Sequence, residues 1–357
     1  MYADTLRSPD LRHVVPLPIG DAFPYVEHDG KIYAFVSSVE EERVRGLDGI
    51  EVVSHAELGL AELIEQGFSY RASRLELLVR ACRMIGIAEA VVPDDFPLAA
   101  AERLRREGIG LRPDSDLFAG RRRSKSPHEL EGIRRAQSAT QRAMGAIRDG
   151  VRAGGDISSE SLRAAARRAT ADDGVIAEYM IIAHGAQAAS VHDEGHGPIA
   201  PGECVVVDLG IRDVDSGCWA DMTRTFCVGE PPEELVGYHA ACMEVHERVV
   251  PLICPGFSAA ELHRRADEIV AARGYPTMLS SGVNVAEGFF HGLGHGVGLE
   301  IHEWPSLAPH GEDLVAGDVI TIEPGVYRPG FGGCRVEDLV LVTDDGYENL
   351  TDFPYDL

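Results

Sequence analysis

The sequence lacks any apolar run that approaches the roughly 18 residues needed to cross a bilayer as a helix. Its first fifteen residues, MYADTLRSPDLRHVV, also lack the basic start and apolar centre of a signal peptide. Both absences predict a soluble, cytoplasmic protein that has no membrane partner.

Positive charge and paired cysteines are scarce as well. There are 33 Lys and Arg residues against 58 Asp and Glu, a formal net charge of −25. Because phosphate binding needs clustered cations, this balance excludes nucleic acid as a partner. The densest basic run, RRRSK at 121–125, is interpreted as a solvated linker. The seven cysteines form no C-x-x-C pair, so neither a disulfide framework nor a thiolate zinc site is predicted.

The length of 357 residues favours two domains, since a single core usually stops growing below this size. Residues 1–120 alternate short apolar runs such as KIYAFVSS with helical patterns such as SRLELLVRACRMIG, which predicts a small α/β domain. Turn-forming and charged residues in RPDSDLFAGRRRSKSPHEL then separate two periodic regions. We therefore predict a second domain at 121–357.

The second domain is predicted to be α+β, with helices separated in sequence from a largely hairpin-connected sheet. Ser126 and Glu129 form a capping box around Pro127, so a long helix is expected from there to about Arg148, ending before Gly150. Two further helices are expected, at 233–253 and after Ser258. Strands are expected at 177–185, 204–210, 218–229, 318–327 and 334–343.

Four acidic residues interrupt these apolar strands: Asp208, Asp221, Glu323 and Glu337. A buried ionised carboxylate is costly unless it is paired or binds a metal ion. Each acid alone also fits an exposed edge or a strand end. If the four converge, their mutual repulsion requires cations, and two divalent ions would neutralise them.

The segment HGLGHGVGLEIHE at 291–303 carries three histidines among glycines. It is not the zinc-binding H-E-x-x-H helix, because Gly292 stands where the glutamate would be and each glycine costs a helix about 1 kcal/mol. We expect an extended segment with a bend, since His295 and His302 would face opposite ways on a regular strand. Together with the four acids, His295 gives an oxygen-rich set that suits Mn²⁺, Co²⁺ or Fe²⁺ and tolerates Zn²⁺.

Four segments, DLGIRDVDSGCWADMTRTF, HGLGHGVGLEIHE, TIEPGVY and GGCRVEDLV, resemble in this order the metal-binding segments of the pita-bread metallopeptidase family. That family includes aminopeptidase P, prolidase and methionine aminopeptidase. RRSKSPHELEGIRRAQ resembles the linker of the aminopeptidase P, prolidase and creatinase branch, which argues against methionine aminopeptidases because these lack the N-terminal domain. The resemblance covers about 125–350 and implies a creatinase-type N-terminal α/β domain followed by a pita-bread catalytic domain.

The resemblance also implies the metal ligands. They are Asp208, Asp221, His295, Glu323 and Glu337, with Asp221 and Glu337 bridging two divalent ions. We expect Mn²⁺ first, with Co²⁺, Zn²⁺ and Fe²⁺ as alternatives. The stretch between the two aspartates is two residues longer than in the family, and its extra acids Asp213 and Asp215 are expected in a hairpin turn, with a third metal position as the alternative.

Further residues receive roles from the same resemblance. Glu323 is expected to guide the proton of the attacking water, and His192 and His302 to act on the substrate near the scissile bond. His291 is expected to line the pocket for the residue after that bond. Arg335 is expected to pair with site carboxylates and to bind substrate. Ordinary roles are expected for the remaining nearby histidines, His184, His196 and His310.

These assignments predict a dimetal hydrolase that cleaves the amide bond preceding proline, either an Xaa-Pro aminopeptidase or a prolidase-type dipeptidase, acting as a homodimer. One alternative on the same fold is hydrolysis of a small non-peptide amide, as in ectoine hydrolases. Creatinases do not keep the five ligands, and dimethylsulfoniopropionate lyases are a further alternative. The last alternative is a non-catalytic, metal-stabilised binding module, although such proteins have usually lost ligands and none is lost here.

Overall fold

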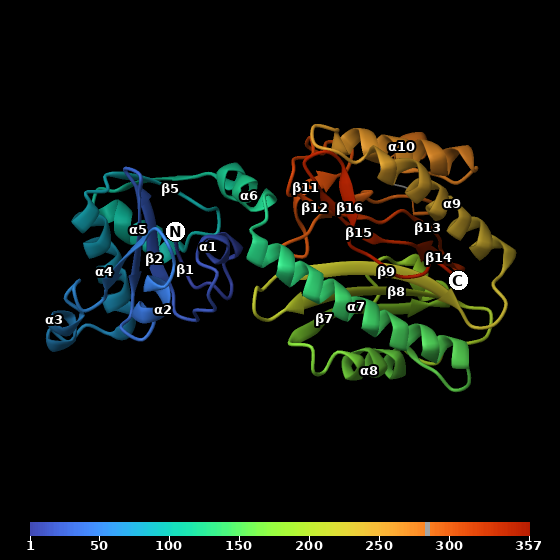
Figure 1. Ribbon diagram of the computed structural model, residues 1–357, viewed down its shortest axis with the longest axis horizontal. Coiled ribbons are helices and arrows are strands. Elements are labelled where there is room, and N and C mark those ends of the chain that lie inside the picture. Colours follow the sequence, from blue (N-terminus) through green and yellow to red (C-terminus); the bar gives the residue numbers. More distant parts are fainter. Residues whose placement is uncertain (283–285) are drawn as a thin grey trace. The chain divides into compact units, whose positions relative to one another are not determined.

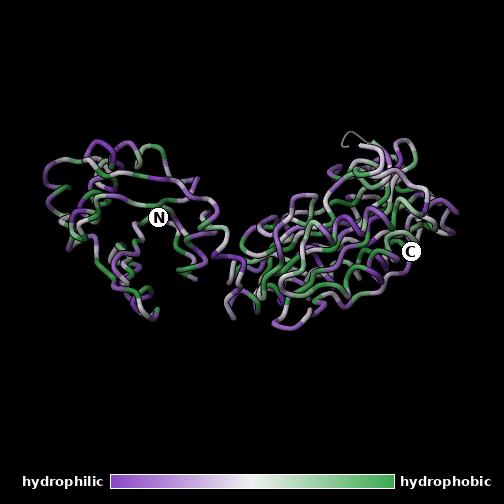
Figure 2. The backbone as a smooth tube through the Cα atoms, turned by 90° about the horizontal axis from the view of Figure 1, so that it is seen from above, coloured by the Kyte–Doolittle hydropathy of each residue, from purple (hydrophilic) through white to green (hydrophobic). Residues whose placement is uncertain are grey.

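The computed structural model describes residues 1–282 and 286–357, and its chain divides into two units, Met1–Arg122 and Arg123–Leu357. The boundary expected after residue 120 falls inside helix α6 (Ser115–Arg123). Along the tube in Figure 2, short hydrophobic stretches alternate with hydrophilic ones in both units, as expected for elements with one buried face. Within the described ranges, no helix combines the length and the hydropathy needed to cross a membrane.

The first unit is a small α/β domain. Four strands form a sheet in the order β1-β2-β3-β4, in which only β3 and β4 are parallel, and β5 and β6 form a separate parallel pair. The strands are β1 (Tyr2–Ala3), β2 (Phe23–His28), β3 (Lys31–Val36), β4 (Ile50–Ser54), β5 (Glu89–Val92) and β6 (Gly110–Pro113). The helices besides α6 are α1 (Pro9–Val14), α2 (Glu41–Arg45), α3 (Leu60–Glu65), α4 (Tyr70–Ile85) and α5 (Leu98–Arg106).

The second unit combines helices with three sheets (Figure 1). Its helices are α7 (Pro127–Ala153), α8 (Ser159–Ala169), α9 (Glu233–Val249), α10 (Ala259–Ala272) and α11 (Met278–Ser281), with short 3₁₀ turns η1 (Gly185–Ala189) and η2 (Val250–Leu252). The three-stranded sheet β7-β8-β9 consists of β7 (Val175–His184), β8 (Cys204–Asp213) and β9 (Trp219–Cys227). The five-stranded sheet β11-β10-β12-β15-β16 consists of β10 (Gly294–Gly296), β11 (Glu303–Leu307), β12 (Val319–Ile322), β15 (Asp338–Val342) and β16 (Tyr347–Asn349). The pair β13-β14 consists of β13 (Gly325–Arg328) and β14 (Gly332–Arg335).

Helix α7 begins as predicted. The Ser126 side chain accepts from the Glu129 backbone, and the Glu129 carboxylate accepts from the Ser126 backbone. The predicted end before Gly150 is wrong, because the helix continues to Ala153. A side chain at Gly150 would come within 2.8 Å of Leu162 on α8, so this glycine allows the two helices to pack closely rather than ending α7.

The interpretation of the basic run as a solvated linker is also wrong. Arg122 and Lys125 are buried, and Arg123 pairs with the buried Asp318. Lys125 pairs with Glu303, whose side chain is also buried. Carboxylates far along the chain therefore neutralise Arg123 and Lys125, and the local sequence does not reveal these pairings.

Alternation along β8 assigns the two faces of the three-stranded sheet. Val205, Val207 and Leu209 pack with α7 and α8 in one hydrophobic cluster. Cys204 and Val206 belong to the cluster on the other face, which also includes α9 and α10. Asp208 has the parity of this second set, so it projects toward the same side as α9 and α10.

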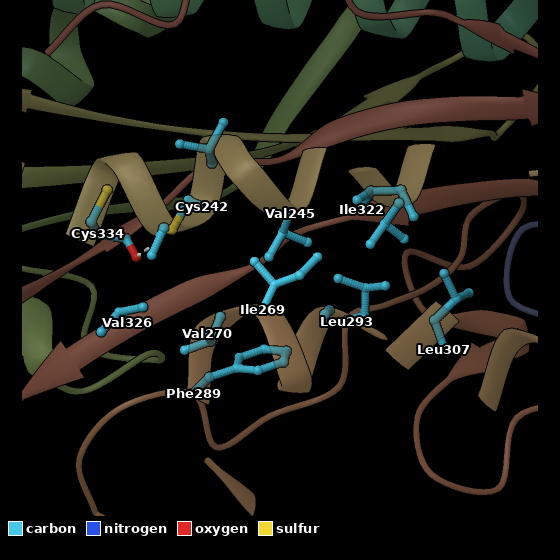
Figure 3. Close-up of a cluster of buried hydrophobic side chains, with 14 of the residues drawn as sticks. Cys242, Val245, Ile269, Val270, Phe289, Leu293, Leu307, Ile322, Val326 and Cys334 are labelled. Carbon is cyan, nitrogen blue, oxygen red and sulfur yellow. Dashed lines mark hydrogen bonds between the residues drawn. The ribbon is translucent and has the colours of Figure 1, made fainter. Parts of the chain in front are cut away.

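Helices α9 and α10 bring together the strands that follow them in sequence. Figure 3 shows Val245 of α9 and Ile269 of α10 among side chains from β12, β13 and the approach to β10. The Cys242 thiol donates to the Cys334 carbonyl across this core, with a sulfur–oxygen distance of 3.7 Å. This packing fixes the strands that carry the remaining acids and His295.

Candidate metal and catalytic centre

Asp208 and Asp221 lie on neighbouring antiparallel strands. Asp208 is opposite Thr223 in the β8–β9 register, and Asp221 is opposite Gly210. The two aspartates are therefore diagonal neighbours on the same face of the sheet. The hairpin between them brings their carboxylates together without any need for the extra acids of the turn.

Glu323 directly follows β12, and Glu337 directly precedes β15. These two strands form a second antiparallel pair. The register joins Ile322 to Asp338, and its continuation places Glu323 beside Glu337. The Glu337 amide donates to the Thr223 carbonyl at 3.0 Å, which connects this pair to β9. Two antiparallel strand pairs that are distant in sequence, β8–β9 and β12–β15, thus bring the four acids to one place.

His295 joins them from β10, and its flanking glycines explain how. An added side chain at Gly294 would come within 2.0 Å of the Thr321 carbonyl oxygen, and one at Gly296 within 2.1 Å of the Trp304 carbonyl oxygen. Both glycines therefore permit a close approach of backbones. The His295 Nε2 atom lies 3.5 Å from the Glu323 carboxylate and 3.8 Å from that of Asp221.

The five residues form three overlapping groups in which the possible ligand atoms lie within 4.8 Å of one another. The groups are Asp208, Asp221 and Glu337; His295, Glu323 and Glu337; and Asp221, His295 and His302. All five residues that the sequence assigned as ligands are thus brought together, and His302 lies beside them.

The acids of this cluster are buried without full compensation. Among the described residues, Asp208 Oδ1, Asp221 Oδ1 and Glu337 Oε1 have no hydrogen-bond partner. Burial and neighbouring carboxylates raise the pKa of Asp221 and of Glu337 well above their usual range. Burial also raises the pKa of Glu323 to about 8, against the opposing effect of Arg335. An oxygen-rich set with unpartnered, buried acceptor atoms fits a site for divalent cations.

Arg335 supplies the nearest positive charge. Its guanidinium donates to Asp208 at 2.6 Å, to the Tyr327 hydroxyl at 2.8 Å and to the Thr223 hydroxyl at 3.2 Å. Its Nε atom lies 4.0 Å from the Glu323 carboxylate. The expected pairing with site carboxylates is therefore observed, while its expected contact with substrate stays a prediction.

Sequence reasoning missed two residues of this network, Thr223 and Tyr327. The Thr223 hydroxyl donates to Glu337 at 2.7 Å, and the buried Tyr327 hydroxyl contacts His291 Nε2 at 3.1 Å. Alternation could have indicated Thr223, because it lies two residues after Asp221 on β9. Tyr327 is the last buried residue of β13, and no signal in the sequence singled it out.

The remaining histidines lie around the acids. The His302 ring packs edge-on against His295 with 4.1 Å between ring centroids. The pKa of His291 is lowered to about 3, chiefly by burial and the Arg335 charge, with a smaller contribution from His192. The pKa of His302 is also lowered, chiefly by burial, again with a contribution from His192. His192 is exposed, and its charge contributes to the lowering of both pKa values.

Asp213 in the longer β8–β9 hairpin is fully engaged elsewhere. Both of its carboxylate oxygens accept from Arg135, at 3.0 and 2.8 Å, and one also accepts from the Ser216 hydroxyl at 2.7 Å. Gly132 on α7 leaves the space that Ser216 occupies. The hairpin turn therefore packs on α7, and this ion pair gives Asp213 a structural role in place of the alternative third metal position.

Comparisons with known proteins agree with this arrangement. Residues 131–344 match the model of metallopeptidase family M24. The chain is 41% identical over 173 residues to an Xaa-Pro dipeptidase of Pyrococcus furiosus, an alignment covering 48% of this chain and 46% of that relative, and 40% identical to one of Pyrococcus horikoshii with the same coverage. The matched region thus spans about half the length of these curated relatives.

Solved structures extend the likeness over nearly the whole chain. The prolidase of Pyrococcus furiosus has a TM-score of 0.76 and 28% identity, covering 93% of this chain and 90% of its own. The X-Pro aminopeptidase of Thermotoga maritima, at 22% identity, shares the fold with a TM-score of 0.80, covering 100% of this chain and 96% of its own. An N-terminal α/β domain followed by a pita-bread domain is thus the architecture of this protein. With its family-model match spanning more than half of the sequence, the chain belongs to metallopeptidase family M24.

Proposed function

We propose that this protein is a two-metal hydrolase that cleaves the amide bond preceding proline in peptides or dipeptides. The observation that carries the proposal is the cluster of acids in which three buried carboxylate oxygens, on Asp208, Asp221 and Glu337, have no hydrogen-bond partner among the described residues. The names of the related Xaa-Pro dipeptidases and of the similar prolidase structure support the choice of substrate.

The residues proposed to hold the metal ions are Asp208, Asp221, His295, Glu323 and Glu337. Divalent ions bound there would lower the pKa of a water molecule and polarise the scissile carbonyl. Mn²⁺ is our first choice because four carboxylates and one imidazole make a hard, oxygen-rich set, with Co²⁺, Zn²⁺ and Fe²⁺ as alternatives.

Glu323 is the proposed acceptor of the proton from the attacking water. Its side chain is 19% exposed, against 5% for Asp221 and 12% for Asp208, so it is the more open of these acids toward solvent. The same carboxyl group then supplies that proton to the leaving nitrogen.

His192 and His302 are the proposed donors toward the substrate. Both are exposed, and the His302 ring lies against that of His295, where a donor to the developing oxyanion would be needed. His291 is the proposed wall of the pocket for proline, with the rings of Phe290 and Tyr327 at 6.0 and 5.5 Å from its own. Arg335 is proposed to orient Asp208 and, through Tyr327, His291. The homodimer stays a prediction from the family resemblance, and the cytoplasmic location stays a prediction from the sequence composition.

A comparison of substrates tests the proposal. Purified protein supplied with Mn²⁺ is expected to hydrolyse Ala-Pro and to leave Ala-Ala almost untouched, because only a tertiary amide with a ring fits the proposed pocket. Gly-Pro against Arg-Pro-Pro then separates a dipeptidase from an aminopeptidase. Equal rates on Ala-Ala and Ala-Pro would overturn the proline specificity, and no turnover of any of these peptides would overturn the peptidase function.

A further inference from the structure

A buried ion pair lies beside the proposed catalytic centre without belonging to it. The Lys125 ammonium is 2.7 Å from the Glu303 carboxylate, and the two side chains are only 1% and 2% exposed. Lys125 comes from the segment before α7, whereas Glu303 directly follows His302. Removing two charges from water costs free energy. A buried ion pair such as this one is therefore best explained by a role in holding nearby segments in a defined position.

The pair packs against the segment that carries His302. A side chain added at Gly298 would lie 2.4 Å from the Glu303 carboxylate and 2.7 Å from Lys125 Cε. Glu303 is also the β11 partner of Gly296, next to the irregular step that follows His295 in β10. The Lys125–Glu303 pair therefore holds both ends of the turn between Gly298 and Glu303.

His302 depends on this turn for its position. It is exposed, and within the described residues no hydrogen bond from its ring is found; its close contact is the edge-on packing against His295 at 4.1 Å between centroids. A ring held in this way moves when the backbone beside it moves. A group that must meet a substrate atom loses much of its effect when it is displaced by about 1 Å.

We propose that Lys125 is a positioning residue that, through Glu303, holds His302 over the metal-binding acids. The inference rests on the proposed function for its catalytic meaning, because His302 acts there as a donor to the substrate. The sequence does not assign this role to Lys125, which lies in the basic run first interpreted as a solvated linker.

The matched control is Arg123, two residues earlier. It forms a similar low-exposure ion pair, with Asp318 at 2.7 Å, but Asp318 precedes β12 and does not adjoin His302. Lys125→Met is expected to lower kcat on Ala-Pro by about 10–100-fold, as for other residues that support a site indirectly, with KM and metal content unchanged. Lys125→Arg is expected to restore most of that loss, and Arg123→Met to leave kcat within about twofold of the parent, as expected for an ion pair remote from the site.

A double-mutant cycle separates positioning from general destabilisation. In a His302→Ala background, Lys125→Met is expected to cause no further loss of kcat, since both changes remove the same contribution. Multiplying losses would show that Lys125 acts independently of His302 and would overturn the inference. Should Lys125→Met fold poorly because Glu303 loses the neighbouring Lys125 charge, Lys125→Met with Glu303→Gln removes both charges. Parental kcat in that double variant would also overturn the inference.

A spectroscopic readout keeps the inference independent of the proposed function. In protein with isotope-labelled histidine, the His302 ring signal, assigned by its loss in His302→Ala, is expected to shift in Lys125→Met and not in Arg123→Met. An unchanged signal in Lys125→Met would overturn the positioning role even if the parent proves to have no peptidase activity. Absence of peptide turnover in the parent, with the shift present, would instead contradict only the proposed function.

Discussion

Glu337 and Asp338 are neighbours at the start of β15, both are almost fully buried, and they face opposite ways. Asp338 accepts from Arg224 at 2.9 Å, from Tyr355 at 2.5 Å and from Asn349 at 2.8 Å. Glu337 accepts from Thr223, while its other oxygen has no partner among the described residues. One buried acid is thus compensated by the protein, and the other is not.

The pKa directions follow from this contrast. Burial alone would raise the pKa of Asp338, but His246, Arg224 and two hydrogen bonds lower it overall. Burial and the charges of Glu323 and Asp208 raise the pKa of Glu337 well above its usual range. Burial of an acid therefore does not mark a functional site. Several uncompensated acids close together do indicate one, and Asp208, Asp221 and Glu337 each have a buried oxygen without a partner among the described residues.

The largest expected effect is on stability and concerns Asp338, the compensated acid. Asp338→Asn leaves the Arg224 guanidinium buried without its counter-charge, so unfolding in urea should show a loss of about 3–5 kcal/mol, typical of a broken buried pair. The loss should be the same with chelator and with Mn²⁺, because Asp338 faces away from the proposed metal site. A loss below about 1 kcal/mol, the value of an exposed pair, would mean that Arg224 is compensated by its backbone acceptors alone.

The next largest expected effect is on turnover and concerns His302, which lies beside the uncompensated acids. His302→Ala should reduce turnover of Ala-Pro by about 10²–10³, the usual cost of removing one donor to a developing oxyanion. Metal content should stay as in the parent, because the five proposed ligands remain. Glu323→Gln, as a control, should reduce both turnover and metal content. Parental turnover in His302→Ala would leave this histidine a structural role only.

The smallest expected effect is on stability, and it compares Glu337 directly with Asp338. In chelator-stripped protein, Glu337→Gln should cost no stability and should gain some, because burial and the neighbouring carboxylates disfavour the ionised form of Glu337. The equivalent change at the next residue, Asp338→Asn, should have the opposite sign. Urea unfolding of both variants, without metal, measures the two changes in the free energy of unfolding. A clear loss for Glu337→Gln would show that this acid is compensated after all.

The features that the sequence predicts well are local or periodic. The capping box at Ser126 predicts the start of α7, and alternation with acids in apolar strands predicts which residues gather at the centre. The glycines beside His295 predict an extended, bending segment rather than a helix, and β10 with its irregular step after His295 confirms this. These signals depend on residues a few positions apart.

The features that sequence reasoning missed depend on partners far apart in the chain. Lys125 looks like part of a solvated run until Glu303 is placed beside it. Gly150 looks like a helix end until Leu162 packs against it. The pairing of Arg224 with Asp338, both buried, also joins residues far apart in the chain. The role of a charged residue such as Lys125, or of a small one such as Gly150, depends on which distant residue packs against it. That partner can be identified only in the folded chain.

Calorimetric titration of chelator-stripped protein with Mn²⁺ tests the central claim most directly. The account predicts that the uncompensated acids take up two ions per chain. It also predicts that Asp338→Asn, if folded, takes up the same number. Absence of saturable binding by correctly folded parent protein would contradict the account, because the orphaned oxygens of Asp208, Asp221 and Glu337 would then be buried for some other reason.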